Sequence, residues 1–167
     1  MIDGIGTSSL FDHPHGIALD TAGNVFVADT FNHRIRKIDP DGVVSTFAGT
    51  GAAGTTDGNR LTARFSSPVG VAIDSSGNLF VADRDNHRIR RVGTDDNVTT
   101  IAGSSAGFID GVGPDPDATA DPGAARFRSP TGVAVDAEGS LVVADQGNHA
   151  IRKVAKPIDP ADPWEVT

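Results

Sequence analysis

The chain has 167 residues, a formal net charge of −8, ten Pro, twenty Gly and no Cys. One domain with a buried core is expected at this length, and the lack of Cys excludes disulfides and thiolate chemistry without fixing the compartment. The acidic balance disfavours nucleic acid as a partner, and no apolar run is long enough to span a membrane.

Three segments of the chain repeat one pattern of residues. They are 11–49, 65–103 and 127–167, with linkers over 50–64 and 104–126. A long period made of short strands and turns is typical of stacked units or propeller blades. We therefore predict a single domain over residues 1–167 that contains three similar units.

The first unit shows what each repeat is expected to form. Its predicted strands, in chain order, are Gly16–Asp20, Val25–Asp29, Arg34–Ile38 and Val43–Ala48. Turn residues separate these short apolar runs, as in a four-stranded antiparallel meander. Four-stranded sheets repeated around an axis define a β-propeller. The predicted fold is therefore all-β, with three propeller blades in this chain.

A motif recurs before the third strand of each unit. It reads Asn32-His33-Arg34-Ile35, then Asn86-His87-Arg88-Ile89, then Asn148-His149-Ala150-Ile151, each after a Val-Ala-Asp. These residues resemble the NHL repeat, and the linkers resemble its bacterial long-linker form. The resemblance implies a propeller, commonly six-bladed, that binds protein or other ligands, and of which this chain would be half. The resemblance is also compatible with an extracytoplasmic location, although Met1–Gly4 has neither the basic start nor the apolar stretch of a signal peptide.

Residues that recur in every unit are expected to build the unit. They are Asp29, Asn32, His33, Asp83, Asn86, His87, Asp145, Asn148 and His149. Three His would suit a catalytic zinc, but equivalent positions on successive blades lie far apart on a ring. We therefore expect each His to hydrogen-bond a neighbouring turn, and each Asp to be buried or to cap a turn.

His13 and His15 break the repeat, since Ser67 and Val69 hold the equivalent positions in the second unit. Both precede the innermost strand and would face one mouth of the propeller. Some related lyases hold zinc with axial His, so one hypothesis is a metal-dependent hydrolase or lyase that uses these two residues. No third His outside the repeat is present, which favours a loop substitution, and we predict no cofactor.

Other residues that differ between units are candidates for contacting a ligand or partner. Phe31 has Asp85 as its counterpart in the second unit. The longer linker adds the acidic residues Asp115, Asp117 and Asp121. Their alternation is similar to a calcium loop, but Ala120 replaces the required Gly and Arg126 the final Glu. A solvated acidic loop is the better interpretation.

The third strands are rich in basic residues. These are Arg34, Arg36, Lys37, Arg88, Arg90, Arg91, Arg152 and Lys153. Some NHL propellers bind single-stranded RNA on a basic face, which makes RNA binding a second alternative function. Here the basic side chains are expected to spread around a rim, where the acidic balance favours pairing with Asp in turns.

The predicted function is a binding or scaffold module for an unknown protein or small molecule, with specificity in the parts that differ between blades. Three blades leave a ring incomplete, and uncovered flanks invite association. The chain begins in a linker and ends in a fourth strand, so two copies head to tail would supply six blades. Ile2, Trp164 and Val166 are expected at that homodimer junction.

Overall fold

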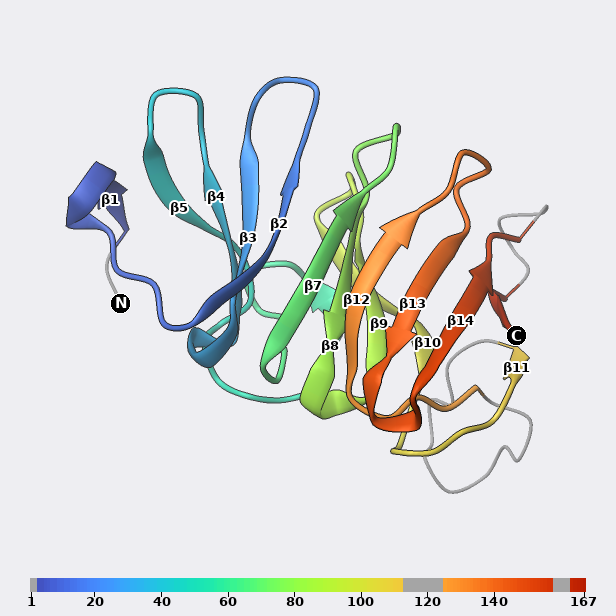
Figure 1. Cartoon of the computed structure of the whole chain (residues 1–167). Coiled ribbons are helices and arrows are strands. Elements are labelled where there is room, and N and C mark those ends of the chain that lie inside the picture. Colours follow the sequence, from blue (N-terminus) through green and yellow to red (C-terminus); the bar gives the residue numbers. More distant parts are fainter. Residues whose placement is uncertain (1–2, 113–124, 158–162) are drawn as a thin grey trace.

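The computed structural model describes residues 3–112, 125–157 and 163–167. These residues form three antiparallel sheets that stand side by side as blades and are joined by loops, while short 3-10 turns connect strands within each blade (Figure 1). The prediction of an all-β fold with three blades is confirmed. The described part of the chain has no helix long and apolar enough to cross a membrane.

Each blade contains five strands in the same spatial order. Blade 1 is β1 (Gly4–Ile5), β5 (Val43–Ala48), β4 (Arg34–Ile38), β3 (Val25–Asp29) and β2 (Pro14–Leu19). Blade 2 is β6 (Gly58–Asn59), β10 (Asn97–Gly103), β9 (Arg88–Val92), β8 (Leu79–Asp83) and β7 (Pro68–Ile73). Blade 3 is β11 (Gly111–Val112), β15 (Glu165–Val166), β14 (Ala150–Ala155), β13 (Leu141–Asp145) and β12 (Pro130–Val135). The 3-10 turns are η1 (Gly6–Ser8), η2 (Thr30–Asn32), η3 (Arg84–Asn86) and η4 (Gln146–Asn148).

The predicted meander accounts for four of these strands, and the linkers add the fifth. The short strands β1, β6 and β11 each pair with the outer strand of the blade that follows them, for example Gly58 opposite Val98. The sequence did not predict them, because two residues are too few to show an alternating pattern. They protect the outer edge of each blade, which would otherwise expose unpaired backbone groups.

Hydrophobic cores lie between the blades. One core joins Phe26 and Ile35 of blade 1 to residues of blade 2 such as Val81. The second joins Phe80 and Ile89 of blade 2 to blade 3 in the same way. Because burial of one large apolar side chain contributes about 1.5–3 kcal/mol, these two seams hold the blades together.

Glycines allow the inner strands to approach one another closely. The inner strands β2, β7 and β12 lie side by side (Figure 1). A Cβ on Gly16 would clash with the carbonyl oxygen of Val69, and a Cβ on Gly70 with that of Thr131. Only a residue without a side chain fits there.

Candidate ligand-binding site

A buried network of Asp, Arg and Asn side chains supports each blade. In blade 2, Asp83 Oδ2 accepts hydrogen bonds from Arg90 Nη1 at 2.8 Å and from Asn86 Nδ2 at 2.7 Å. Asp83 Oδ1 accepts from the backbone N–H of Ser66 at 2.7 Å, and the Arg90 guanidinium also pairs with Asp57. The same set recurs as Asp29, Asn32, Arg36 and Asp3, and as Asp145, Asn148, Arg152 and Asp110.

This network corrects the expectation that the basic residues of the third strands spread around an exposed rim. Arg36, Arg90 and Arg152 are buried. A buried cation is stable only when it is paired and hydrogen-bonded, and here two carboxylates, one of them from the linker, surround each guanidinium. Long-range pairing of this kind has no local sequence signal. Three of the eight basic residues of the third strands are therefore buried and cannot contribute to an RNA-binding surface.

The motif histidines connect one blade to the next. His33 has left-handed backbone geometry, with φ at 52°, and its Nδ1 accepts the N–H of Ser67 at 3.0 Å. His87 accepts the N–H of Ser129 at 3.0 Å in the same way. Burial lowers the pKa of His87, although the nearby Asp85 opposes that shift. Within the described residues, no cluster of three or more ligating side chains would hold a metal ion.

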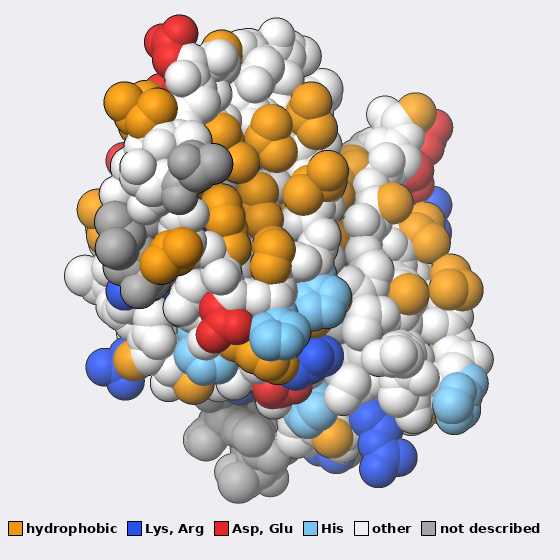
Figure 2. Space-filling view, turned by 60° about the vertical axis from the view of Figure 1, so that its left-hand side comes forward, with side chains coloured by type: hydrophobic (Ala, Val, Ile, Leu, Met, Phe, Trp, Pro, Cys, Tyr) orange, Lys and Arg blue, Asp and Glu red, His pale blue; other side chains and the backbone are white. Residues whose placement is uncertain are grey.

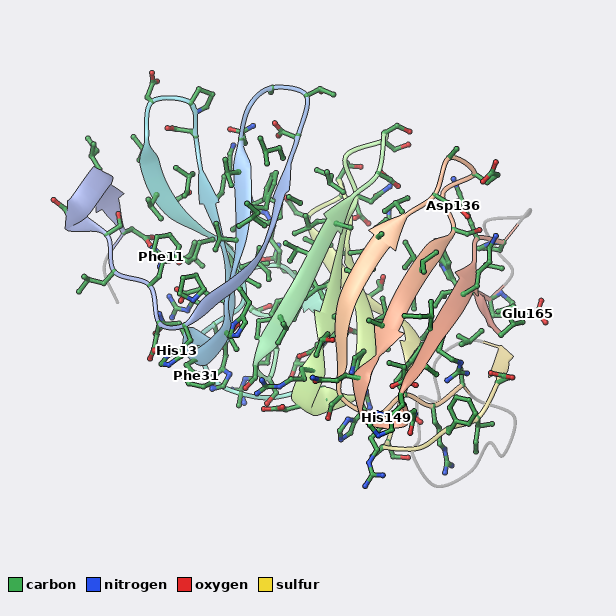
Figure 3. All side chains as sticks on the ribbon, in the orientation of Figure 1. Phe11, His13, Phe31, Asp136, His149 and Glu165 are labelled. Atoms are coloured by element: carbon green, nitrogen blue, oxygen red, sulfur yellow. The ribbon has the colours of Figure 1, made fainter. Side chains whose placement is uncertain are left out.

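Blade 1 carries a cluster that the other blades lack, formed by Asp12, His13, His15 and Phe31, which we name the blade 1 mouth. The ring centroids of His13 and Phe31 are 4.3 Å apart. The His13 side chain is 63% exposed and Phe31 is 47% exposed, so this pair belongs to the surface (Figure 3). The sequence groups His13 with His15 and gives Phe31 as a separate candidate, and the structure places the Phe31 ring against that of His13.

Hydrogen bonds fix which imidazole nitrogens of the mouth face a ligand. His13 Nδ1 lies 2.7 Å from the carboxylate of Asp12, and His15 Nδ1 lies 2.9 Å from the carbonyl oxygen of His13. Because carbonyl and carboxylate oxygens accept, both Nδ1 atoms carry the proton in the neutral rings. Each Nε2 is then left as an acceptor. Asp12 was missed by the sequence analysis, and its position next to His13 was the available signal.

The remaining candidates lie elsewhere. Asp85 pairs with Arg84 at 2.7 Å, and this hydrogen bond lowers the pKa of Asp85. Trp164 contacts Phe80 with ring centroids 5.8 Å apart, and Val166 is buried in the same seam between blades 2 and 3. Ile2, Asp115, Asp117 and Asp121 lie outside the described residues. A role of Trp164 and Val166 at a dimer junction stays a prediction.

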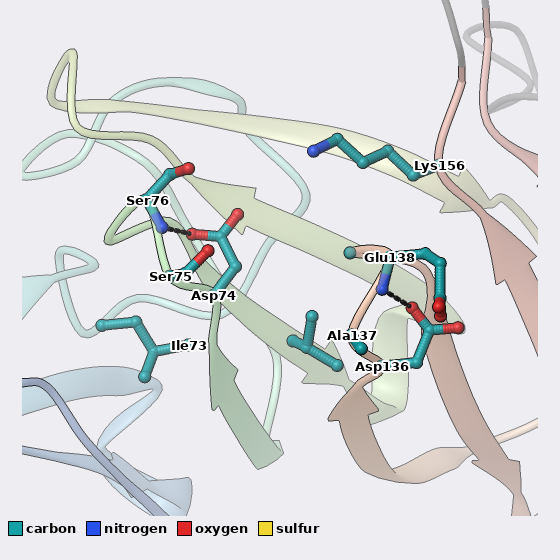
Figure 4. A pocket seen from close by; sticks show the side chains of 10 residues that line it. Ile73, Asp74, Ser75, Ser76, Asp136, Ala137, Glu138 and Lys156 are labelled. Atoms are coloured by element: carbon teal, nitrogen blue, oxygen red, sulfur yellow. Dashed lines mark hydrogen bonds between the residues drawn. The ribbon is translucent and has the colours of Figure 1, made fainter.

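Clefts open at the other end of the blades, between successive hairpin turns. One of about 310 Å³ lies between Asp74–Ser76 and Asp136–Gly139, beside Lys156 (Figure 4). A second of about 230 Å³ lies between the turns of blades 1 and 2. Asp74 and Asp136 accept backbone N–H bonds within their own turns. Because the clefts recur at both seams and their Asp side chains cap turns, they are features of the repeat.

Antiparallel blades that pack face to face, with their inner strands side by side, define the chain as an arc of a β-propeller. The family model of the NHL repeat matches residues 11–38, 65–92 and 127–154. The chain belongs to the NHL repeat family.

Comparisons with known proteins agree with this assignment. Protein SUPPRESSOR OF QUENCHING 1 of Arabidopsis thaliana is 41% identical over 59% of this chain, and NHL repeat-containing protein 2 of Bos taurus is 39% identical over 53%. The chain spans only 10% and 13% of those two proteins.

Solved structures show the same fold. A Bacteroides thetaiotaomicron protein of unknown function is 27% identical over the whole chain, with a TM-score of 0.74, and the chain covers 38% of it. A gluconolactonase from Xanthomonas campestris is 16% identical over 94% of the chain, with a TM-score of 0.60, and the chain covers 46% of it. At that identity the second likeness shows the fold alone.

Proposed function

We propose that the chain is a binding module and that the blade 1 mouth is its ligand surface. The observation that carries this proposal is the exposed contact between His13 and Phe31. Ser67 and Asp85 hold these positions in blade 2, and Ser129 and Gly147 hold them in blade 3. The repeat therefore folds without an aromatic pair, and an exposed pair that folding does not require is available for recognition.

The chemistry of the mouth indicates the class of ligand. Phe31 and the His13 ring offer faces on which an aromatic group stacks. The Nε2 atoms of His13 and His15 accept hydrogen bonds, as does the carboxylate of Asp12. A peptide or small molecule with an aromatic ring beside N–H donors satisfies both requirements.

N-acetyl-tyrosinamide, which joins a phenol ring to two amide groups, is a suitable probe. Titration followed by ¹⁵N–¹H NMR is expected to give saturable shifts around Phe31. The double variant His13→Ser, Phe31→Asp installs the residues of blade 2, so it should abolish the shifts and leave the fold intact. Asp85→Ala is the matched control and should bind normally. Equal shifts in the double variant would contradict the proposal.

We further propose that a second copy of the chain closes the ring head to tail. The blades have apolar faces at both ends of the arc, with Ile17 and Ile151 exposed there. Such faces favour association. The expected particle in light scattering has twice the 17.2 kDa mass of one chain.

Two alternative functions can be tested directly. The first alternative is a metal-dependent enzyme, in which the Nε2 atoms of His13 and His15 would ligate zinc. Histidines that ligate metals commonly have their other ring nitrogen held by a carboxylate or carbonyl, as Nδ1 is in both residues here. Stoichiometric zinc that is lost in His13→Ala and His15→Ala would favour this alternative. RNA binding would require affinity that falls steeply with salt.

A further inference from the structure

Each blade has two different faces, and the chain contains two seams in which a face of one blade packs on a face of the next. The forward face contacts the following blade, and in blade 2 it presents Phe80 and Ile89. The rear face contacts the preceding blade, and in blade 2 it presents Val71 and Val81. Both seams therefore join a forward face to a rear face. No described seam joins two faces of the same kind.

One face of each kind is uncovered at the ends of the arc. On the rear face of blade 1, Ile17 is 62% exposed, whereas its counterpart Val71 is 7% exposed. On the forward face of blade 3, Ile151 is 71% exposed, whereas its counterpart Ile89 is fully buried. In Figure 2, the blade 1 end of the molecule comes forward. Hydrophobic side chains gather on the surface in that view, and histidines lie near its lower part.

Polar groups at the two uncovered faces are also complementary. In the seams within the chain, the Nδ1 of a motif His accepts the N–H of the Ser before the inner strand. His13 is the counterpart of that Ser, and among the described residues its N–H has no acceptor and His149 Nδ1 has no donor. His13 and His149 lie toward the same end of the blades (Figure 3).

The forward face of blade 3 also has room for the backbone of a further blade to approach Gly132. Gly16 and Gly70 each lie against a carbonyl of the next blade, those of Val69 and Thr131. Gly132 is their counterpart in blade 3, and a Cβ on it would meet only the Ala144 side chain, at 3.2 Å. The carbonyl that fills the equivalent place in a further seam is that of His15, by its position in the repeat.

We propose that the forward face of blade 3 of one copy docks on the rear face of blade 1 of a second copy, so that His149 of the first copy completes the blade 1 mouth of the second. A second copy fits because forward faces of this chain already bind its rear faces. His149 would accept the His13 N–H through Nδ1, which leaves its Nε2–H as a donor beside two Nε2 acceptors. The mouth would then bind both the N–H and C=O groups of a peptide-like ligand. This part of the inference rests on the proposed function of the mouth as the ligand surface.

The assembly is tested on the full chain by sedimentation velocity and light scattering. The expected wild-type species is a dimer of the 17.2 kDa chain. Ile17→Asp on the rear face and Ile151→Asp on the forward face should each give monomers with an unchanged circular dichroism spectrum. Leu61→Asp is the control, because Leu61 is 53% exposed in the segment that leads into the enclosed blade 2. A wild-type monomer at all concentrations would overturn the proposal.

Mixing the two variants tests the head-to-tail geometry. Ile17→Asp keeps its forward face and Ile151→Asp keeps its rear face, so an equimolar mixture should recover a heterodimer through one intact seam. Like-to-like pairing predicts that one of the two variants still dimerises alone and that mixing has no effect. Either of those results overturns the head-to-tail seam.

The mouth is tested separately from the assembly. His149→Ala removes one hydrogen bond from each seam, so dimer affinity should fall by roughly 2- to 10-fold per seam. At a concentration where this variant is still dimeric, binding of N-acetyl-tyrosinamide should weaken, whereas His87→Ala should leave it unchanged. Unchanged binding in His149→Ala refutes the shared mouth. If wild-type dimers form but bind no probe, the proposed function alone fails.

Discussion

Blade 2 and its neighbours have the same repeat but different surroundings. Ile89 in blade 2 is fully buried, whereas Ile151 at the equivalent position of blade 3 is 71% exposed. Both residues lie on the forward face of a sheet with the same strand order. The comparison teaches that the repeat specifies which face each side chain takes, and that the adjacent blade decides whether the side chain leaves water.

The largest effect is expected inside the network of the enclosed blade. Asp83→Ala removes the buried one of the two carboxylates that pair with Arg90, and breaking a buried ion pair in this way costs about 3–5 kcal/mol of unfolding free energy. Asp85→Ala breaks only the exposed pair with Arg84 and should change the free energy by less than about 1 kcal/mol. Urea unfolding measures both. Similar losses in the two variants would show that burial does not control the strength of these pairs.

The second experiment compares the two isoleucines directly. Ile89→Ala should lower the unfolding free energy by about 2–5 kcal/mol, as core truncations do. Ile151→Ala should change it by no more than about 0.5 kcal/mol when the protein is dilute enough to be monomeric.

Protein concentration then sharpens this comparison. If a second copy covers Ile151, the cost of Ile151→Ala should rise with concentration, because association stabilises the folded state by mass action. The cost of Ile89→Ala should not change. A concentration-independent result for both variants would show that the open face stays uncovered.

The smallest effect concerns pH at the seam between blades 2 and 3. Burial lowers the pKa of His87 in the folded chain, whereas in the unfolded chain it titrates near its ordinary value of about 6.5. The unfolded state therefore binds more protons as the pH falls through that value, so the His87 contribution is complete above it and is lost below it.

Thermal melts from pH 7.5 to 5.5 test this direction, and the midpoint should fall with pH. His87→Asn is the matched variant, because Asn tolerates the left-handed backbone and does not titrate. Part of the pH dependence should disappear in it. An identical slope in the variant would mean that other groups cause the effect.

Much of the blade could be predicted from local sequence. Turn residues such as Asp20 and Gly23 bound the first hairpin, and the alternating apolar runs gave the strands on either side. The blade-specific residues His13 and Phe31 could also be singled out. Their contact could not, since it depends on how the start of β2 packs against η2.

The short edge strands and the buried guanidinium groups escaped prediction for a related reason. Arg90 stands in the run Arg88-Ile89-Arg90-Arg91, whose basic residues are typical of an exposed strand. Only the fold brings Asp57 from the linker and Asp83 from the neighbouring strand to the same guanidinium. Pairing between residues that are distant in the chain stabilises these guanidinium groups but produces no periodic pattern in the sequence.

Local sequence is enough to establish that this protein is a set of repeated antiparallel blades, because strand, turn and repeat signals all act over short distances along the chain. The tertiary structure decided which charged residues are buried, which His joins one blade to the next, and which apolar faces are left open. Those outcomes depend on neighbours in space. The same Ile is therefore core in blade 2 and surface in blade 3.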